Sequence, residues 1–302
     1  MRRLRPETRW AYVFVLPWLA GLLVFQLGPM VASLVLSLTD YDLIDSPRFA
    51  GLDNYTRMAE DPKVARAIGN TVLYTALHVP LAIVIALALA LILNRVTGRA
   101  AGVFRTVFYL PSMTPYVAVG VLFLFLLNGQ AGMVNQFLAL FGVSGPQWTT
   151  DPDWMLAGIV VMSLWNLGTT TIILFAALRN VPRELSEAAM IDGAGAWQRF
   201  RAVTVPMISS ALFFVVIINT ITSLQMFDQV YTMYFSSQTA QQASGDAALF
   251  YVVYLFQQAF QFLHMGYASA LAWVLFVVIA LITLVQVKVG GRLVYYEAEE
   301  HA

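Results

Sequence analysis

Six long stretches of the chain contain only apolar, small and uncharged polar residues, without a single Asp, Glu, Lys or Arg. A helix needs about 20 residues to cross roughly 30 Å of hydrocarbon, and burying a charge at its centre costs at least about 2.5–3.5 kcal/mol. The pattern therefore predicts an all-α integral membrane protein with six transmembrane helices. Their expected ranges are 11–38, 71–93, 107–127, 155–178, 205–227 and 267–287.

Prolines inside these runs modify that picture only slightly. Pro80 lies in the second run, and Pro111 and Pro115 lie in the third. Membrane helices tolerate proline where neighbouring groups satisfy the freed carbonyls, so we expect kinks in otherwise continuous helices.

The Lys and Arg residues show which side of the membrane each connection occupies. Thirteen of the seventeen lie in the N-terminal segment, the second-to-third and fourth-to-fifth connections and the tail, and the other four lie in the first loop, 39–70. By the positive-inside rule, both termini are cytoplasmic. The expected organisation is a cytoplasmic N-terminus (1–10), one transmembrane domain (11–288) and a cytoplasmic tail (289–302).

The first run is too long for the apolar core of a signal peptide and is expected to be a retained anchor.

A seventh apolar segment, 247–262, is interrupted by three glutamines. If it crossed the membrane, the tail would lie outside, against the charge rule. We expect it to be an interfacial or re-entrant helix packed on the bundle.

Composition excludes several kinds of chemistry. The chain is 59% hydrophobic and 11% charged, and its formal net charge of zero gives no overall field for nucleic acid. It has no cysteine, and its three histidines are far apart in sequence, so no metal site is expected.

The cytoplasmic connection 179–204 has the most distinctive pattern. Pro182 and Glu184 suit the first turn of a short helix that continues through Ile191, and Asp192-Gly193 then predicts a turn. A second short helix follows, with apolar residues at helical spacing at Trp197, Phe200 and Val203. Periodicity alone is equally consistent with two helices whose apolar sides lie among lipid headgroups.

This connection resembles the signature loop of the inner-membrane permeases of binding-protein-dependent ABC importers. The resemblance is carried by Glu187, Ala188, Ala189, Asp192, Gly193, Ala194, Val203, Val205 and Pro206. It extends to 51–55, 70–71, 104–111 and Trp165, and it is greatest with the carbohydrate-uptake, maltose-permease-like branch.

The resemblance implies the type I importer permease fold and a coupling loop, 179–204, that docks on an ATP-hydrolysing subunit. It implies docking roles for Glu187, Ala188, Ala189, Asp192, Gly193 and Ala194. It also implies a heterodimer with a second permease, two ATPase subunits, an extracytoplasmic solute-binding protein and a location in the bacterial inner membrane. The chain itself is expected to be no enzyme and to bind no cofactor, because it has no Gly-Lys-[Ser/Thr] phosphate loop; ATP and Mg would be held by the ATPase subunits.

Uncharged polar residues within the fourth and fifth runs are candidates for the solute pathway, since sugar hydroxyls need hydrogen-bonding partners and an aromatic face. The candidates are Trp165, Asn166, Thr169, Asn219, Thr222, Ser223 and Met226. Asn219, Ser223 and Met226 share a helical face. Interhelical hydrogen bonding and ordinary tryptophan packing are the alternatives.

Two other classes of function remain to be weighed. An ion-coupled secondary transporter would use acids within the membrane, which the six runs lack. An enzyme acting on lipid-linked substrates could use Asp40, Asp42 and Asp45, although a solvated loop explains these acids more simply. The expected cargo is a mono-, di- or oligosaccharide, with glycerol phosphate as an alternative, and the particular sugar stays open.

Overall fold

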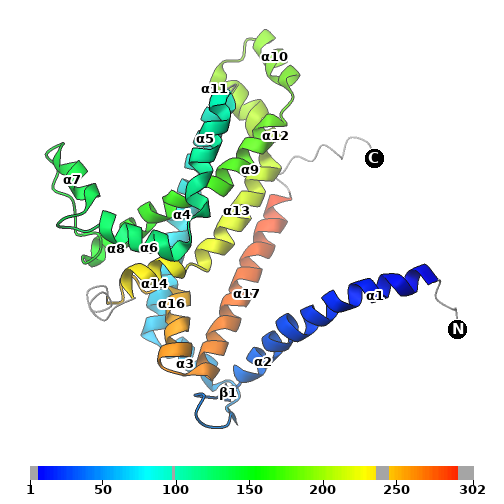
Figure 1. The fold of residues 1–302 in the computed structure, drawn as a ribbon, viewed down its shortest axis with the longest axis vertical. Helices are drawn as coiled ribbons and strands as arrows, with labels where there is room; N and C mark the ends of the chain where they lie inside the picture. Colours follow the sequence, from blue (N-terminus) through cyan, green and yellow to red (C-terminus); the bar gives the residue numbers. More distant parts are fainter. Residues whose placement is uncertain (1–5, 97–98, 236–244, 292–302) are drawn as a thin grey trace. The chain divides into compact units, whose positions relative to one another are not determined.

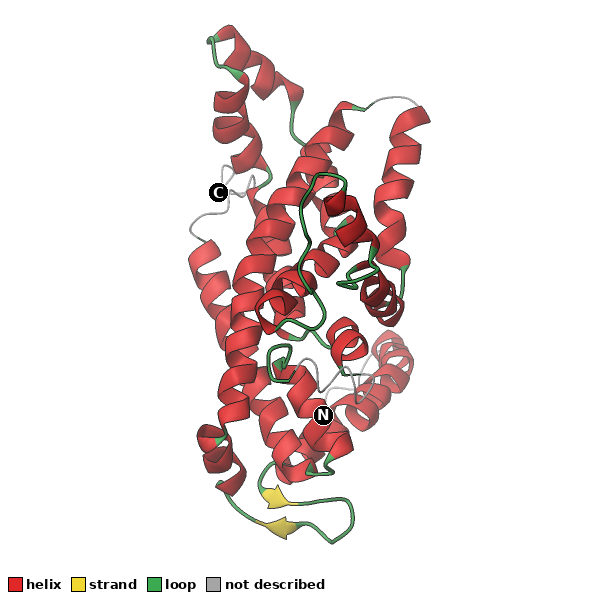
Figure 2. Cartoon of the chain, turned by 90° about the vertical axis from the view of Figure 1, so that its left-hand side faces the viewer, coloured by secondary structure: helices red, strands yellow, loops and turns green. Residues whose placement is uncertain are grey.

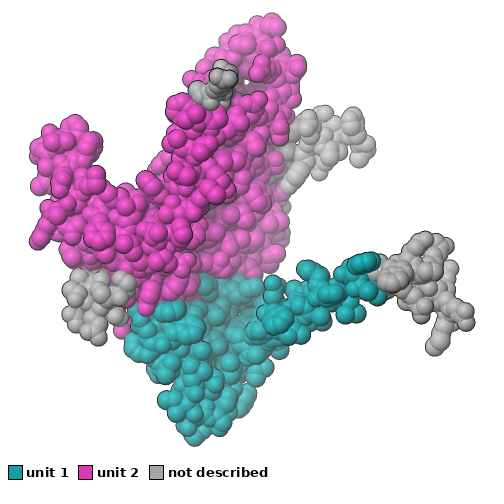
Figure 3. Space-filling view, in the orientation of Figure 1, with its two compact units in different colours: residues 1–62, 255–278 teal, residues 63–254, 279–302 magenta. Residues whose placement is uncertain are grey.

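The computed structural model describes residues 6–96, 99–235 and 245–291, most of which are helical (Figure 2). The chain divides into two units: unit 1 comprises residues 1–62 and 255–278, and unit 2 comprises residues 63–254 and 279–302 (Figure 3). Parts of the expected cytoplasmic N-terminus and tail, 1–5 and 292–302, lie outside the described residues.

The elements are labelled in Figure 1. The helices are α1 (Pro6–Gly21), α2 (Gly28–Leu36), α3 (Asp53–Glu60), α4 (Pro62–Arg95), α5 (Arg99–Tyr109), α6 (Tyr116–Leu126), α7 (Met133–Ala139), α8 (Pro152–Ser163), α9 (Gly168–Arg179), α10 (Arg183–Ile191), α11 (Ala196–Arg199), α12 (Val205–Met207), α13 (Ser209–Leu224), α14 (Asp228–Tyr234), α16 (Tyr251–Phe256) and α17 (Met265–Gly290). Short π-helical turns occupy Leu22–Leu27, Phe200–Thr204 and Gln257–Gln261, and 3-10 turns occupy Leu110–Met113 and Leu164–Asn166. Strands β1 (Thr39–Asp40) and β2 (Arg48–Phe49) form an antiparallel pair, with Thr39 opposite Phe49.

Within the described parts of the chain, four helical segments are long and apolar enough to cross a membrane, judged by length and composition. They are Val13–Leu36, Pro62–Arg95, Ser209–Tyr234 and Met265–Gly290. Two bent pairs raise the total to six: Gly102–Met113 with Tyr116–Leu126, and Pro152–Asn166 with Gly168–Arg179. The six-span, all-α prediction therefore agrees with the structure if each bent pair is one span.

The third and fourth spans are bent pairs of helices, a larger distortion than the kinks expected from proline. The third bends by 96° and the fourth by 50°. Pro111 and Pro115 flank the first break, where proline removes a backbone N–H and its ring clashes with the preceding turn. Pro80, by contrast, lies within the continuous helix α4. Proline alone therefore does not locate a break in this chain.

In unit 1, polar side chains hold the segments around the β-hairpin. The Asn54 amide donates hydrogen bonds of 2.9 Å to the carbonyl oxygens of Ser37 and Thr39. The Tyr267 hydroxyl donates to the carboxylate of Asp61 at 2.9 Å. The two Asn54 bonds give hydrogen-bond partners to main-chain carbonyls at and just before β1.

The core of unit 2 is formed by α4, α9 and α13. On α4, the small residues Ala82, Ala86 and Ala90 recur every four positions and are buried. Small side chains let neighbouring helices approach closely, which is how helices associate where no hydrophobic force separates protein from lipid. Ala86 and Ala90 belong with larger apolar residues to one cluster: Ala86, Ala90, Leu93, Leu174, Phe175, Leu178, Ile208 and Val215.

The segment 247–262 packs on the helices, as predicted. In unit 2, the amide nitrogen of Tyr251 donates to the Thr71 hydroxyl at 3.0 Å, and Phe250 meets the Tyr74 ring edge-on with centroids 5.4 Å apart. Asn70 donates to the carbonyl oxygens of three residues within 246–249 at 3.0–3.1 Å. The eleven residues of α16 and the following π turn rise only about 16 Å, so this segment does not span a bilayer.

Candidate functional site

Unit 2 contains a cavity of about 450 Å³ whose lining combines hydroxyl, amide, imidazole and carboxylate groups with apolar side chains. Helices α4, α8, α9, α13 and α14 and both bent spans contribute to it. Its polar lining residues are Tyr74, His78, Ser112, Tyr116, Ser163, Asn166, Thr169, Thr170, Asn219, Thr222, Ser223, Gln225, Asp228 and Gln229.

Six of the seven predicted pathway residues line this cavity. They are Asn166, Thr169, Asn219, Thr222, Ser223 and Met226. Trp165 does not; its indole lies edge-on to Phe123, with ring centroids 6.0 Å apart. Because Trp165 and Asn166 are consecutive in a 3-10 turn, their side chains point about 120° apart, and only Asn166 reaches the cavity.

Helix breaks cluster around the cavity. Helix α13 ends at Leu224 and α14 begins at Asp228, and the intervening residues Gln225 to Phe227 all line the cavity. The 3-10 turn between α8 and α9 contributes Asn166. Irregular backbone at membrane depth is tolerated where it is buried in protein or lines a water-filled space, so the breaks fit a polar cavity between apolar helices.

Two hydrogen bonds join helices across the cavity wall. The Tyr74 hydroxyl donates to Ser163 Oγ at 2.9 Å, and His78 Nδ1 and Ser223 Oγ lie 3.0 Å apart. The Tyr74 and His78 rings stack with centroids 5.1 Å apart and planes 9° from parallel. Ser223 thus also has the bridging role that the interhelical hydrogen-bond alternative requires.

Asn219 likewise fits both the solute-pathway interpretation and the interhelical hydrogen-bond alternative. Its amide donates to Thr170 Oγ1 at 3.2 Å and to the carbonyl oxygen of Val215 at 2.8 Å. Thr169 and Thr222 are exposed, by contrast, and line the cavity. The lining therefore contains side chains that fix the helices and others that face the open space.

Sequence reasoning missed the contribution of α4. Tyr74 and His78 are four residues apart and so lie on one helical face, which turns toward the cavity. The available signal was His78 itself, because an ionisable residue within a transmembrane segment is by default a candidate functional residue.

The predicted coupling segment forms two short helices, as expected. Helix α10 ends in a Schellman motif: the Gly193 N–H donates to the Met190 carbonyl at 3.0 Å, and the Ala194 N–H donates to the Ala189 carbonyl at 2.9 Å. Gly193 has φ +82°, the left-handed conformation that favours glycine, and a Cβ there would meet no atom within 4 Å. Backbone conformation therefore explains this glycine without any close approach inside the chain.

Large apolar side chains are exposed on these two helices, beside charged ones such as Glu184 and Glu187. Ile191 is 88% exposed and Trp197 is 70% exposed, and Leu185 and Met190 are also exposed. Figure 1 shows α10 and α11 at one end of unit 2 and α14 toward the other. Glu187, Ala188, Asp192 and Gly193 are exposed on the same segment, and Ala189 and Ala194 are half-buried.

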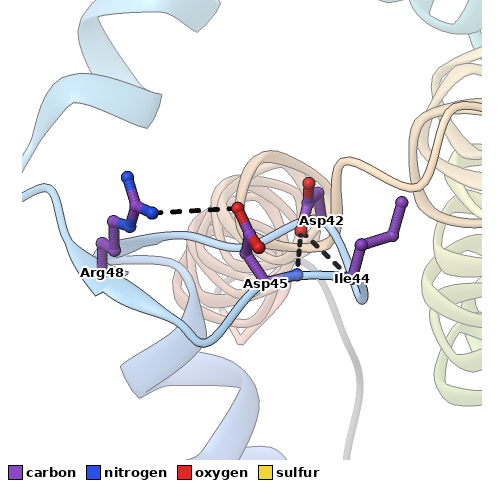
Figure 4. A network of polar contacts seen from close by, with 4 residues as sticks. All are labelled: Asp42, Ile44, Asp45 and Arg48. Atoms are coloured by element: carbon purple, nitrogen blue, oxygen red, sulfur yellow. Dashed lines mark hydrogen bonds and ion pairs between the residues drawn. The ribbon is translucent and has the colours of Figure 1, made fainter.

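The acids of the first loop stabilise a turn. Asp42 accepts hydrogen bonds from the backbone N–H groups of Asp45 at 2.9 Å and Ile44 at 3.1 Å, and Arg48 lies 3.8 Å from the Asp45 carboxylate (Figure 4). The N–H donors of Asp45 and Ile44 lower the pKa of Asp42. Among the described residues, no group of three or more His, Cys, Asp or Glu could hold a metal ion. These contacts favour a solvated turn over a catalytic cluster.

Comparison with known proteins adds independent information. Residues 79–294 match the family of binding-protein-dependent transport system inner membrane components. The chain is 36% identical over 302 residues to the probable ABC transporter permease protein YesP of Bacillus subtilis, covering 99% of this chain and 96% of the relative. It is 36% identical over 282 residues to the lactose transport system permease protein LacF of Rhizobium radiobacter, covering 91% and 92%.

The fold is also found in a solved structure. A chain of a bacterial ABC transporter involved in the import of the acidic polysaccharide alginate superposes with a TM-score of 0.82 at 23% identity, covering 96% of this chain and 97% of that one. The predicted type I permease fold is therefore confirmed. Together with the family match, these findings establish that the chain belongs to the inner-membrane components of binding-protein-dependent transport systems and is a permease subunit of an ABC importer.

Proposed function

We propose that this chain forms half of the translocation pathway for a saccharide, in the inner membrane of a bacterium, and that the cavity in unit 2 is part of that pathway. The observation that carries the proposal is the concentration of polar side chains in a cavity between helices that are otherwise apolar. Polar side chains are expensive within a membrane and usually face the bundle interior or a water-filled space.

The chemistry of the cavity suits a sugar. Threonine hydroxyls and the Asn166 amide can donate to and accept from sugar hydroxyls, while Tyr74 and Tyr116 supply aromatic groups. Its volume of about 450 Å³ falls within the range of roughly 300–1,000 Å³ that is usual for ligand sites. The transport of lactose by one relative's system and of arabinooligosaccharides by another's supports a saccharide cargo.

Coupling to ATP hydrolysis is assigned to α10 and α11. In this proposal their exposed apolar side chains, above all Ile191 and Trp197, are covered by an ATPase subunit, and Glu187, Ala188, Ala189, Asp192, Gly193 and Ala194 form the docking segment. Burying a large apolar side chain contributes about 1.5–3 kcal/mol, which is a physical reason for such a surface to be occupied.

The remaining partners follow from this arrangement. A second permease supplies the other half of the pathway, two ATPase subunits hold ATP and Mg, and an extracytoplasmic binding protein delivers the cargo. The solved alginate transporter was crystallised in complex with a pentasaccharide-bound periplasmic protein, which supports a delivery partner of this kind. This chain binds no cofactor and performs no covalent chemistry in the proposal.

The test is solute uptake by proteoliposomes that contain this chain, its partner permease, the ATPase and the binding protein. The proposal predicts saccharide uptake that requires internal ATP and the binding protein and that survives collapse of ion gradients. Uptake that persists without ATP and disappears with the ion gradient would instead identify an ion-coupled transporter. A cysteine at Thr222 provides a local control, because a bulky thiol reagent in the cavity should block uptake.

A further inference from the structure

In the described part of the chain, the charge on the lining of the cavity of unit 2 is of one sign, negative. Among the described residues that line it, Asp228 is the one carboxylate, and no lysine or arginine is present. Asp228 is exposed and is the first residue of α14, directly after the break at residues 225–227. The carboxylate therefore lies where the chain leaves the long apolar helix α13.

Asp228 also has a simpler, structural role, which does not neutralise its negative charge. An acid in the first turn of a helix complements the positive end of the helix dipole, which is also the position of Asp153 in α8. Asp153 is exposed too, but it does not line the cavity, so the two acids share a local role and differ in what they face.

We infer that Asp228 gives this half of the pathway a negative potential that favours neutral or cationic saccharides over acidic ones. The inference rests on the proposed function of the cavity and specifies the charge class of its cargo. A charge beside a cavity with low-dielectric walls acts more strongly than one on an open surface, because the field is screened less by water and salt. The same carboxylate can accept hydrogen bonds from the hydroxyls of a neutral sugar.

The absence of cysteine from the chain allows the potential to be measured directly. A single cysteine at Thr222, an exposed lining residue, is labelled in the assembled complex with cationic and anionic methanethiosulfonate reagents of similar size. The modification of this chain is followed by mass spectrometry. The ratio of the cationic to the anionic rate reports the local potential.

Asp228→Asn should lower this ratio by about threefold to tenfold, as expected for the loss of one nearby charge in a partly screened site. High salt should reduce the difference. Asp153→Asn is the matched control. It removes the same charge from the first turn of α8, but Asp153 does not line the cavity, so this variant should leave the ratio unchanged. An equal ratio in the wild-type and Asp228→Asn backgrounds would overturn the inference.

Selectivity is tested separately in the reconstituted importer, with a transported neutral sugar and its uronic acid. Asp228→Asn should raise the rate for the acid relative to that for the neutral sugar by a similar factor, and Asp153→Asn should not. An unchanged rate ratio despite a changed potential would refute the role in selectivity. Because labelling needs neither ATP nor transport, failure of the proposed function would show as absent ATP-driven uptake while the labelling result still tests Asp228.

Discussion

Replacing Gly168 by alanine tests the packing at the break of the fourth span. Gly168 begins α9, and a Cβ there would lie 2.7 Å from the carbonyl oxygen of Phe108 and 3.1 Å from the Cα of Tyr109. Both are main-chain atoms of α5, so a side-chain rotation cannot relieve the overlap. Overpacking of this kind typically costs about 1–3 kcal/mol.

Gly158→Ala is the matched control. Gly158 lies within α8, and its added Cβ would meet its nearest neighbours at 3.4–3.5 Å, which is ordinary van der Waals contact. Replacing a mid-helix glycine by alanine stabilises a helix by roughly 0.5–1 kcal/mol. This variant should therefore be neutral or slightly more stable than the wild type.

The assay is thermal unfolding of the purified permease pair in detergent, followed by tryptophan fluorescence. At roughly 2–4 °C per kcal/mol, Gly168→Ala should unfold about 2–12 °C below the wild type. Saccharide uptake at low temperature should also fall, because residues next to Gly168 line the cavity. Equal or higher thermal stability of Gly168→Ala, with Gly158→Ala unchanged, would refute the close contact between α9 and α5.

Three further predictions concern local polar contacts. Asn70→Ala removes three hydrogen bonds to carbonyls within 246–249 and should speed amide exchange in the segment that follows, measured by mass spectrometry. Tyr74→Phe leaves Ser163 without its interhelical partner and should destabilise unit 2 by about 1 kcal/mol, seen as a small shift in thermal unfolding. The pKa of Asp42 is lowered below 3.8, so its stabilisation of the first loop is present above that value and is lost as pH falls through the lower folded-state pKa. Asp42→Asn should abolish this pH dependence of loop amide exchange.

Charge and apolar patterning predicted six spans, which agrees with the structure if each bent pair is one span. The fifth and sixth runs, 205–227 and 267–287, overlap the apolar segments Ser209–Tyr234 and Met265–Gly290. The breaks in the third and fourth spans could not be predicted in the same way, because hydropathy does not depend on helix direction. Pro80 and Pro111 have similar apolar neighbours, yet only the latter lies at a break.

The cavity was only partly predictable from sequence. Spacing placed Asn219, Ser223 and Met226 on one face, and all three line the cavity. Spacing could not indicate that Tyr74 and His78 belong beside them, since their helix is remote in sequence and pairing between helices depends on tertiary packing. The expected sidedness of the termini and the docking roles within 179–204 stay predictions.

The measurement that most directly tests the central claim compares Gly193→Trp with Gly142→Trp in the reconstituted importer. Both glycines have positive φ, at +82° and +74°, and an added Cβ meets nothing within 4 Å at either, so their local backbone strain should be comparable. If α10 docks on an ATPase, Gly193→Trp should abolish ATP-driven uptake and cargo-stimulated ATP hydrolysis, whereas Gly142→Trp should retain both. Full activity of Gly193→Trp in a correctly inserted complex, or equal losses in the two variants, would contradict the assignment of α10 and α11 as the coupling contact.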